Sequence, residues 1–121
     1  MQVAREGHSC VLVVDQFNQK KIVVAGGSNF GGDLKSTEIY DLNKQVWTRG
    51  PDLPTTVRYS SMVTASPGSK YIAYLVGGIQ GGLMGNNIYA LTKNLDRWDE
   101  VGKFTTPRAW HVALKLPLGV C

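Results

Sequence analysis

Residues 20–27 read KKIVVAGG, and residues 71–78, 51 positions further on, read YIAYLVGG. Each segment contains an apolar run that stops at a glycine doublet. In the second segment the run is six apolar residues without alternation, which is typical of a strand that is buried on both faces. A recurrence at a fixed period has to be traced before any secondary structure is assigned, because it decides the fold.

Other landmarks recur in the same order at a period near 50 residues. They are, each with its later copies, Trp47 with Trp98, Ile39–Tyr40 with Ile88–Tyr89, Arg5 with Arg58 and Arg108, and His8 with Ser61 and His111. This conserved order within one chain indicates two copies of a single unit, followed by the opening of a third.

Each unit predicts four short strands joined by polar turns. In the first unit they are Ser9–Val14, Ile22–Ala25, Thr37–Leu42 and Gln45–Arg49, and in the second unit the second strand is Tyr71–Val76. No segment sustains the 3.6-residue apolar period of a helix. The fold class is therefore all-β, and four-stranded sheets at this period are typical of propeller blades.

The order Arg-x-x-His, Gly-Gly, Tyr, Trp resembles the kelch repeat. The segments that carry the resemblance are HSCVLVV, KIVVAGG, STEIYDLNKQVW and GPDLPTTVR in the first unit, and SSMVTA, YIAYLVGG, NNIYALTKNLDRW and TTPR in the second. The resemblance implies kelch-type β-propeller blades, each a four-stranded antiparallel sheet. It implies an incomplete propeller over residues 1–121, with a first blade over 5–54, a second over 55–105 and the start of a third over 106–121.

Two blades cannot close a propeller, which needs four to eight. Their outer sheet faces would expose more apolar surface than soluble monomers normally do. We therefore expect the chain to be part of a longer propeller, or to self-associate when isolated. The third-blade strand would lie around residues 112–116.

Composition and charge exclude several classes of function. The 13 Lys and Arg residues outnumber the 9 Asp and Glu residues but do not cluster, so no nucleic-acid partner is predicted. No apolar run approaches the ~20 residues that span a bilayer, so no membrane association is predicted. The N-terminus lacks the apolar core of a signal peptide, and the cysteines are Cys10 and Cys121. We therefore expect a cytoplasmic protein without a disulfide framework.

The recurring residues are interpreted as structural. They are Gly26, Gly27, Tyr40, Trp47, Gly77, Gly78, Tyr89 and Trp98. The loops GGSNFGG and GGIQGGLMG have neither a following GK[ST] nor a helix, so a close backbone approach explains their glycines better than a phosphate does. No metal-ligand spacing and no catalytic constellation is present, so we predict no metal, no cofactor and no enzymatic activity.

The kelch resemblance implies a non-catalytic protein–protein interaction module. In that family, the loops between the second and third strands and the segments leading into the first strand form the partner-binding face. Here those loops are residues 28–36 and 79–86. The candidate contact residues are Asn29, Phe30, Asp33, Tyr59, Gln80, Leu83, Met84, Asn86 and Trp110. One version of this function is substrate recognition for a cullin-type ubiquitin ligase adaptor. The alternatives are an actin-binding cytoskeletal protein and, with less support, part of a propeller enzyme.

Overall fold

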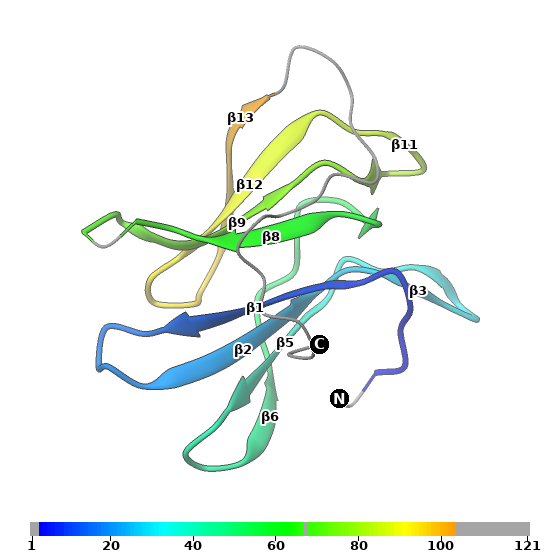
Figure 1. Cartoon of the computed structure of the whole chain (residues 1–121). Helices are drawn as coiled ribbons and strands as arrows, with labels where there is room; N and C mark the ends of the chain where they lie inside the picture. Colours follow the sequence, from blue (N-terminus) through cyan, green and yellow to red (C-terminus); the bar gives the residue numbers. More distant parts are fainter. Residues whose placement is uncertain (1–2, 67, 104–121) are drawn as a thin grey trace.

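Two four-stranded antiparallel sheets form the computed structural model of the chain, which describes residues 3–66 and 68–103 (Figure 1). The first sheet contains β1 (Ser9–Val14), β2 (Lys20–Ala25), β5 (Thr37–Asp41) and β6 (Val46–Arg49). The second contains β8 (Ser61–Thr64), β9 (Tyr71–Val76), β12 (Asn87–Thr92) and β13 (Trp98–Lys103). Strands adjacent in each sheet follow one another in the chain, apart from the short hairpins described below.

This architecture confirms the predicted all-β class and the two four-stranded units. The described residues contain no helix, and so none that could cross a membrane. The predicted third blade, including Arg108, Trp110 and His111, lies outside the described residues.

The hydrophobic core lies between the two sheets. Side chains alternate between the faces of a strand, so Val11, Val23 and Ile39 share one face of the first sheet. They belong to one buried cluster with residues of the second sheet that include Leu75 and Leu91. Each sheet therefore buries one face against the other, as neighbouring propeller blades do.

Trp98 joins the two sheets directly. Its side chain is 6% exposed, and its indole Nε1 donates a hydrogen bond of 3.1 Å to Oγ1 of Thr37 on β5. Trp47, in the corresponding place on the first sheet, is only half-buried, and its ring lies 5.0 Å from that of Tyr40. The difference arises because Trp98 has a neighbouring sheet to pack on, whereas Trp47 lies on the face away from the second sheet.

In the segments that precede the first strand of each blade, the equivalent residues in the structure differ by one position from those aligned by sequence. Ser9 and Ser61 are equivalent, because each pairs with the residue just before a glycine doublet. Gly7 and Tyr59, two residues earlier, share a left-handed backbone with φ of 64° and 57°. The equivalent pairs are therefore Arg5 with Val57, Glu6 with Arg58, and His8 with Ser60. The alignments of Arg5 with Arg58 and of His8 with Ser61 are wrong by one residue, since backbone geometry and not residue type sets the register.

The recurrence of Tyr40 as Tyr89 also needs correction. Tyr40 lies directly opposite Trp47, whereas the residue opposite Trp98 is Leu91. Tyr89 lies two positions earlier, on the same face of the strand and buried in the core. A shift of two residues preserves the face of a strand, which is why the aromatic pattern looked periodic.

Truncation of the two tryptophans is expected to have unequal effects. Trp98→Ala should lower the free energy of unfolding by about 3–5 kcal/mol, because it empties a buried site between the sheets. Trp47→Ala should cost less, since that side chain is half-exposed. Urea unfolding of both variants measures the difference, and equal losses would contradict the placement of the core between the sheets.

Candidate interaction face

Both loops proposed to bind partners contain a short β-hairpin that the sequence did not predict. The loop after β2 forms β3 (Ser28–Asn29) and β4 (Gly32–Asp33). The loop after β9 forms β10 (Ile79–Gln80) and β11 (Leu83–Met84). In Figure 1 both hairpins lie on the right, at the end of the molecule that we call the hairpin end.

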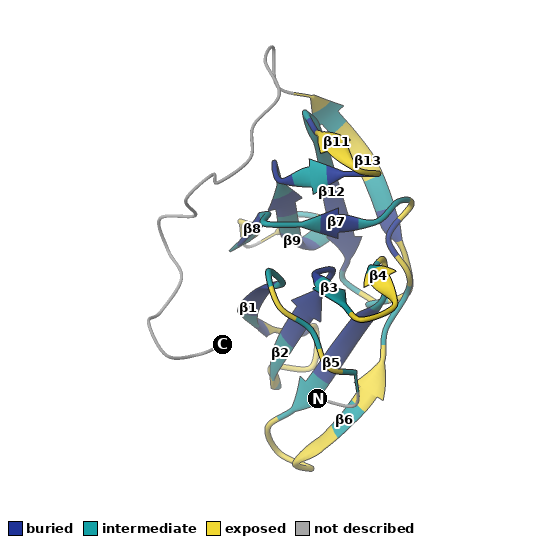
Figure 2. Ribbon diagram, turned by 90° about the vertical axis from the view of Figure 1, so that its right-hand side faces the viewer, coloured by how far each residue is buried: buried dark blue, intermediate teal, exposed yellow. Residues whose placement is uncertain are grey.

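Each hairpin pairs with the segment that leads into the first strand of its own blade. Glu6 forms a bridge with Ser28 in the first blade. In the second blade β7 (Val57–Arg58) pairs with β10. Figure 2 shows β3, β4, β7 and β11 together at the hairpin end. The loops and the lead-in segments therefore form one hydrogen-bonded surface.

The glycine doublets allow this pairing. A Cβ atom at Gly27 would lie 2.7 Å from the carbonyl oxygen of Glu6, and one at Gly78 would lie 2.5 Å from that of Arg58. Both glycines also have positive φ, 97° and 85°, which side chains rarely adopt. The glycine doublets thus allow the lead-in segments to pass close to the end of the second strand of each blade.

Hydrogen bonds at the hairpin end also connect the two blades. The amide of Gly27 donates to the carbonyl of Val57 at 2.7 Å, and the amide of Val57 donates to Leu34 at 3.1 Å. The amide of Tyr59 donates to the carbonyl of Gly7 at 2.8 Å. The segment around β7 is therefore held by both blades.

Arg5 fixes the base of the first hairpin loop. Its fully buried side chain donates to the carbonyls of Gly26 and Ser36 at 2.8 and 3.0 Å, and forms an ion pair of 2.9 Å with Glu38. Such a buried pair holds a defined geometry but leaves a costly unpaired charge when one partner is removed. The role of Arg5 is structural, although Val57 takes the equivalent place in the second blade.

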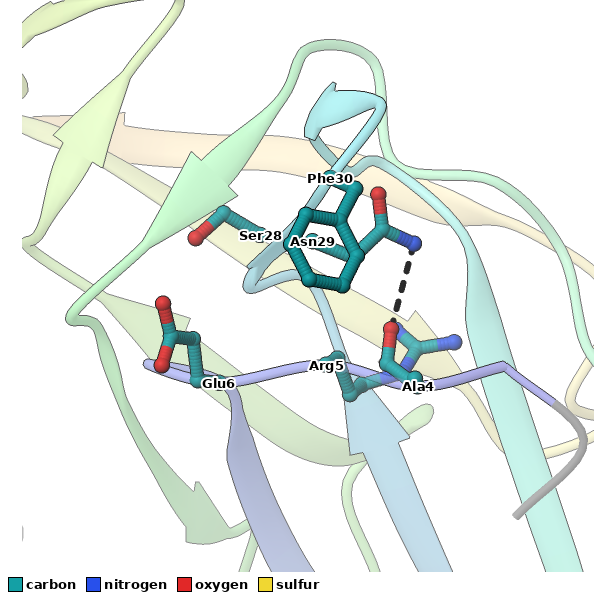
Figure 3. A pocket seen from close by; sticks show the side chains of 6 residues that line it. All are labelled: Ala4, Arg5, Glu6, Ser28, Asn29 and Phe30. Atoms are coloured by element: carbon teal, nitrogen blue, oxygen red, sulfur yellow. Dashed lines mark hydrogen bonds between the residues drawn. The ribbon is translucent and has the colours of Figure 1, made fainter.

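Large apolar side chains at the hairpin end are exposed. Phe30 is fully exposed at the tip of the β3–β4 hairpin, and Leu83 and Met84 are exposed on β11. Figure 3 shows Phe30 beside a cavity of about 340 Å³, which is also lined by Ala4 and Arg5. Burial in the described fold gives no reason for these three residues to be apolar.

Other candidate contact residues have partners within the chain. The amide of Asn29 donates to the carbonyl of Ala4 at 3.1 Å, the dashed line in Figure 3. Asp33 lies 3.5 Å from Nε of Arg58, an ion pair longer than a good hydrogen bond. The guanidinium of Arg58 in turn lies 5.4 Å from the ring centre of Tyr59. Asp33, Arg58 and Tyr59 therefore form one chain of contacts, here called the polar ridge, which joins β4 to the lead-in segment of the second blade.

Gln80 was predicted to contact a partner, but its side chain points into the protein. It is 8% exposed, and its side-chain amide donates to the carbonyls of Gly77 and Asn87, both at 3.0 Å. Its side chain supports the second loop from inside, a role that its position in a polar loop could not reveal. Asn86 is half-buried, and Trp110 lies outside the described residues.

His8 and Cys10 lie at the start of β1. The described residues contain no group of three or more His, Cys, Asp or Glu side chains that could hold a metal ion. Burial, together with the positive charge of Arg5, lowers the pKa of His8. Its Nδ1 is buried and makes no hydrogen bond in the part of the chain that the structure describes. Cys10 is buried and disulfide-bonded, whereas the sequence analysis expected no disulfide framework.

Stacked four-stranded antiparallel sheets with this connectivity define blades of a β-propeller. The comparison with family models names their type: residues 17–54 match the Kelch motif. The matched segment spans β2 to β6 and the two hairpin strands between them. The chain thus carries a kelch repeat in kelch-type propeller blades. A search of curated proteins found no match.

Removal of Arg5 is expected to destabilise the first blade. Arg5→Met should lower the free energy of unfolding by about 3–5 kcal/mol, because Glu38 is left buried without its partner. The double variant Arg5→Met with Glu38→Leu should recover much of that loss, since it removes both charges. Chemical denaturation of the two variants tests this, and a double variant no more stable than the single one would show that the ion pair is not the cause.

Proposed function

We propose that the hairpin end binds a partner protein through Phe30, Leu83 and Met84. The kelch motif is a protein–protein interaction repeat, which supports the general class. The observation that carries the specific proposal is the exposure of these three apolar side chains on two hairpins at one end of the molecule. Aromatic residues and Met are enriched at interfaces, where a few anchors supply most of the binding energy.

The scaffold beneath these side chains favours binding. The hairpins pair with the lead-in segments, and Arg5 anchors the base of the first loop. A surface ordered before binding loses less conformational entropy when the partner docks. The polar ridge adds the charges of Asp33 and Arg58 to the hairpin end, and these groups would select among partners.

Substrate recognition for a cullin-type ubiquitin ligase is a narrower form of this proposal, and actin binding is its alternative. Both rest on the kelch resemblance. A cytoplasmic location belongs to the same proposal, and the disulfide-bonded Cys10 counts against it, because disulfides are rare in the reducing cytosol. Co-sedimentation with actin filaments and co-precipitation with a cullin complex distinguish the two forms.

Apolar residues also remain on the face of the second sheet that points away from the first. Val63, Tyr74, Val76 and Ile88 are half-buried there. Val63 and Tyr74 are the counterparts of the core residues Val11 and Val23 in the first sheet. We propose that further blades, or further copies of the chain, cover this face.

The combined variant Phe30→Ser, Leu83→Ser and Met84→Ser is expected to lose partner proteins without losing stability. Each site is exposed, so each change should alter the free energy of unfolding by about 0.5 kcal/mol or less. Affinity capture followed by mass spectrometry identifies proteins retained by the wild type, and binding isotherms with those proteins give the affinity of each variant.

Phe17→Ser is the matched control, because Phe17 is also exposed but lies in the turn between β1 and β2, at the opposite end of the blade. It should retain the partners. The proposal is wrong if the combined variant binds them as tightly as the wild type, or if Phe17→Ser loses them equally.

A further inference from the structure

A groove lies between the two sheets at the end opposite the hairpins. This turn end consists of the turns that join β1 to β2, β5 to β6, β8 to β9 and β12 to β13, on the left of Figure 1. The groove has a volume of about 500 Å³, and its lining includes Leu12, Val14, Tyr71, Ile72 and Lys93. Val14 is 51% exposed, whereas Ile72 is buried, so the apolar lining of the groove is open to solvent at Val14.

A smaller, polar hollow of about 190 Å³ adjoins the groove and shares Tyr71 and Lys93 with it. Lys70 lines this hollow as well, and its ammonium group lies 5.2 Å from the ring centre of Tyr71. The amide of Lys93 donates to the carbonyl of Lys70 at 3.3 Å, which keeps the two lysines adjacent.

These two lysines have no ion-pair partner among the described residues. The nearby carboxylates are already engaged: Asp99 is paired with Arg97 at 2.9 Å, and Asp96 accepts a hydrogen bond from the hydroxyl of Thr92. The hydrogen bonds from Arg97 and Tyr71, and at longer range the charge of Lys70, lower the pKa of Asp99. Lys70 and Lys93 thus lie beside the groove without a close ion-pair partner in the described part of the chain.

The charge of the whole turn end has the same sign. It carries six cations against four carboxylates, whereas the hairpin end carries five of each. The turn-end residues are Lys20, Lys21, Lys44, Lys70, Lys93 and Arg97 against Asp15, Asp41, Asp96 and Asp99. The positive excess of the described residues thus lies entirely at the turn end.

Local contacts hold the walls of the groove in place. Asp15 accepts hydrogen bonds from the amides of Phe17 and Gln19, both at 2.9 Å, and pairs with Lys21 at 3.1 Å. The side chain of Gln16 donates to that of Asn94 at 3.1 Å and so connects a turn of the first sheet to one of the second. A groove with fixed walls is better suited to binding than one formed by mobile turns.

We propose that this groove is a second docking surface, which binds an extended acidic segment of a partner protein. A carboxylate of that segment binds Lys70 and Lys93, and a neighbouring apolar side chain packs on Val14 and the half-buried Leu12. The carboxylates interspersed among the lysines favour discrete acidic side chains over the continuous phosphates of a nucleic acid, which they would repel. This surface is separate from the hairpin end and does not depend on the function proposed for it.

Fluorescence anisotropy of the 121-residue chain with a labelled hexapeptide, which carries two glutamates beside one leucine, tests the proposal. The wild type should bind it saturably. Lys70→Gln with Lys93→Gln should weaken the Kd about tenfold, because two exposed charge contacts are lost. Lys35→Gln with Lys103→Gln is the matched control, since both lysines are exposed and lie at the hairpin end.

Two altered peptides separate the charged and apolar contributions. Replacing the glutamates with glutamine, or the leucine with glycine, should weaken binding to the wild type. The combined Phe30, Leu83 and Met84 variant should bind the original peptide normally, which keeps this test independent of the hairpin end.

The proposal is overturned by the absence of saturable binding to the wild type, or by equal losses in the two lysine pairs. It is also overturned if the glutamine peptide binds as well as the original. Tighter binding of a single-stranded RNA hexamer that depends on Lys70 and Lys93 would make the groove a nucleic-acid surface instead.

Discussion

The rest of the structure depends on one constraint, which is the close crossing of the lead-in segments over the backbone at the glycine doublets. Gly27 and Gly78 each lie so close to a lead-in carbonyl that a Cβ atom would collide with it. Without this approach the lead-in segments could not pair with the hairpin loops. The amide of Gly27 also bonds to Val57, so the same crossing connects the first blade to the second.

The residues of the hairpin end therefore have two roles: some hold the loops in place from inside, and others are exposed on the surface and available to a partner. Arg5 and Gln80 hold the two loops from inside, through buried hydrogen bonds. Phe30 and Leu83 project from the hairpins that these contacts support. The opposite end of the blades has a different character, because its turns combine a partly apolar groove with Lys70 and Lys93, which form no close ion pair among the described residues.

Periodicity and strand pattern were enough to predict the blades, since β2 and β9 each contain an unbroken apolar run. The expected burial of β9 on both faces was wrong for the described residues, because Tyr74 and Val76 are only half-buried on the face away from the first sheet. The alignment of the two lead-in segments could not be read from residue type. Arg58 is an arginine like Arg5 but is structurally equivalent to Glu6, and only the left-handed backbone shared by Gly7 and Tyr59 reveals this. The hairpins were missed because strands of two residues leave no periodic signal. The inward orientation of Gln80 was missed for a related reason, since a polar residue in a loop carries no mark of burial.

Hydrogen exchange followed by NMR tests most directly whether the crossing holds the hairpin end together. The amides of Gly27, Val57 and Tyr59, which bond to carbonyls of distant segments, are predicted to exchange as slowly as that of Val23 in the middle of β2. Exchange of these three amides as fast as that of Asn43, in the exposed turn after β5, while Val23 remains protected, would contradict the account.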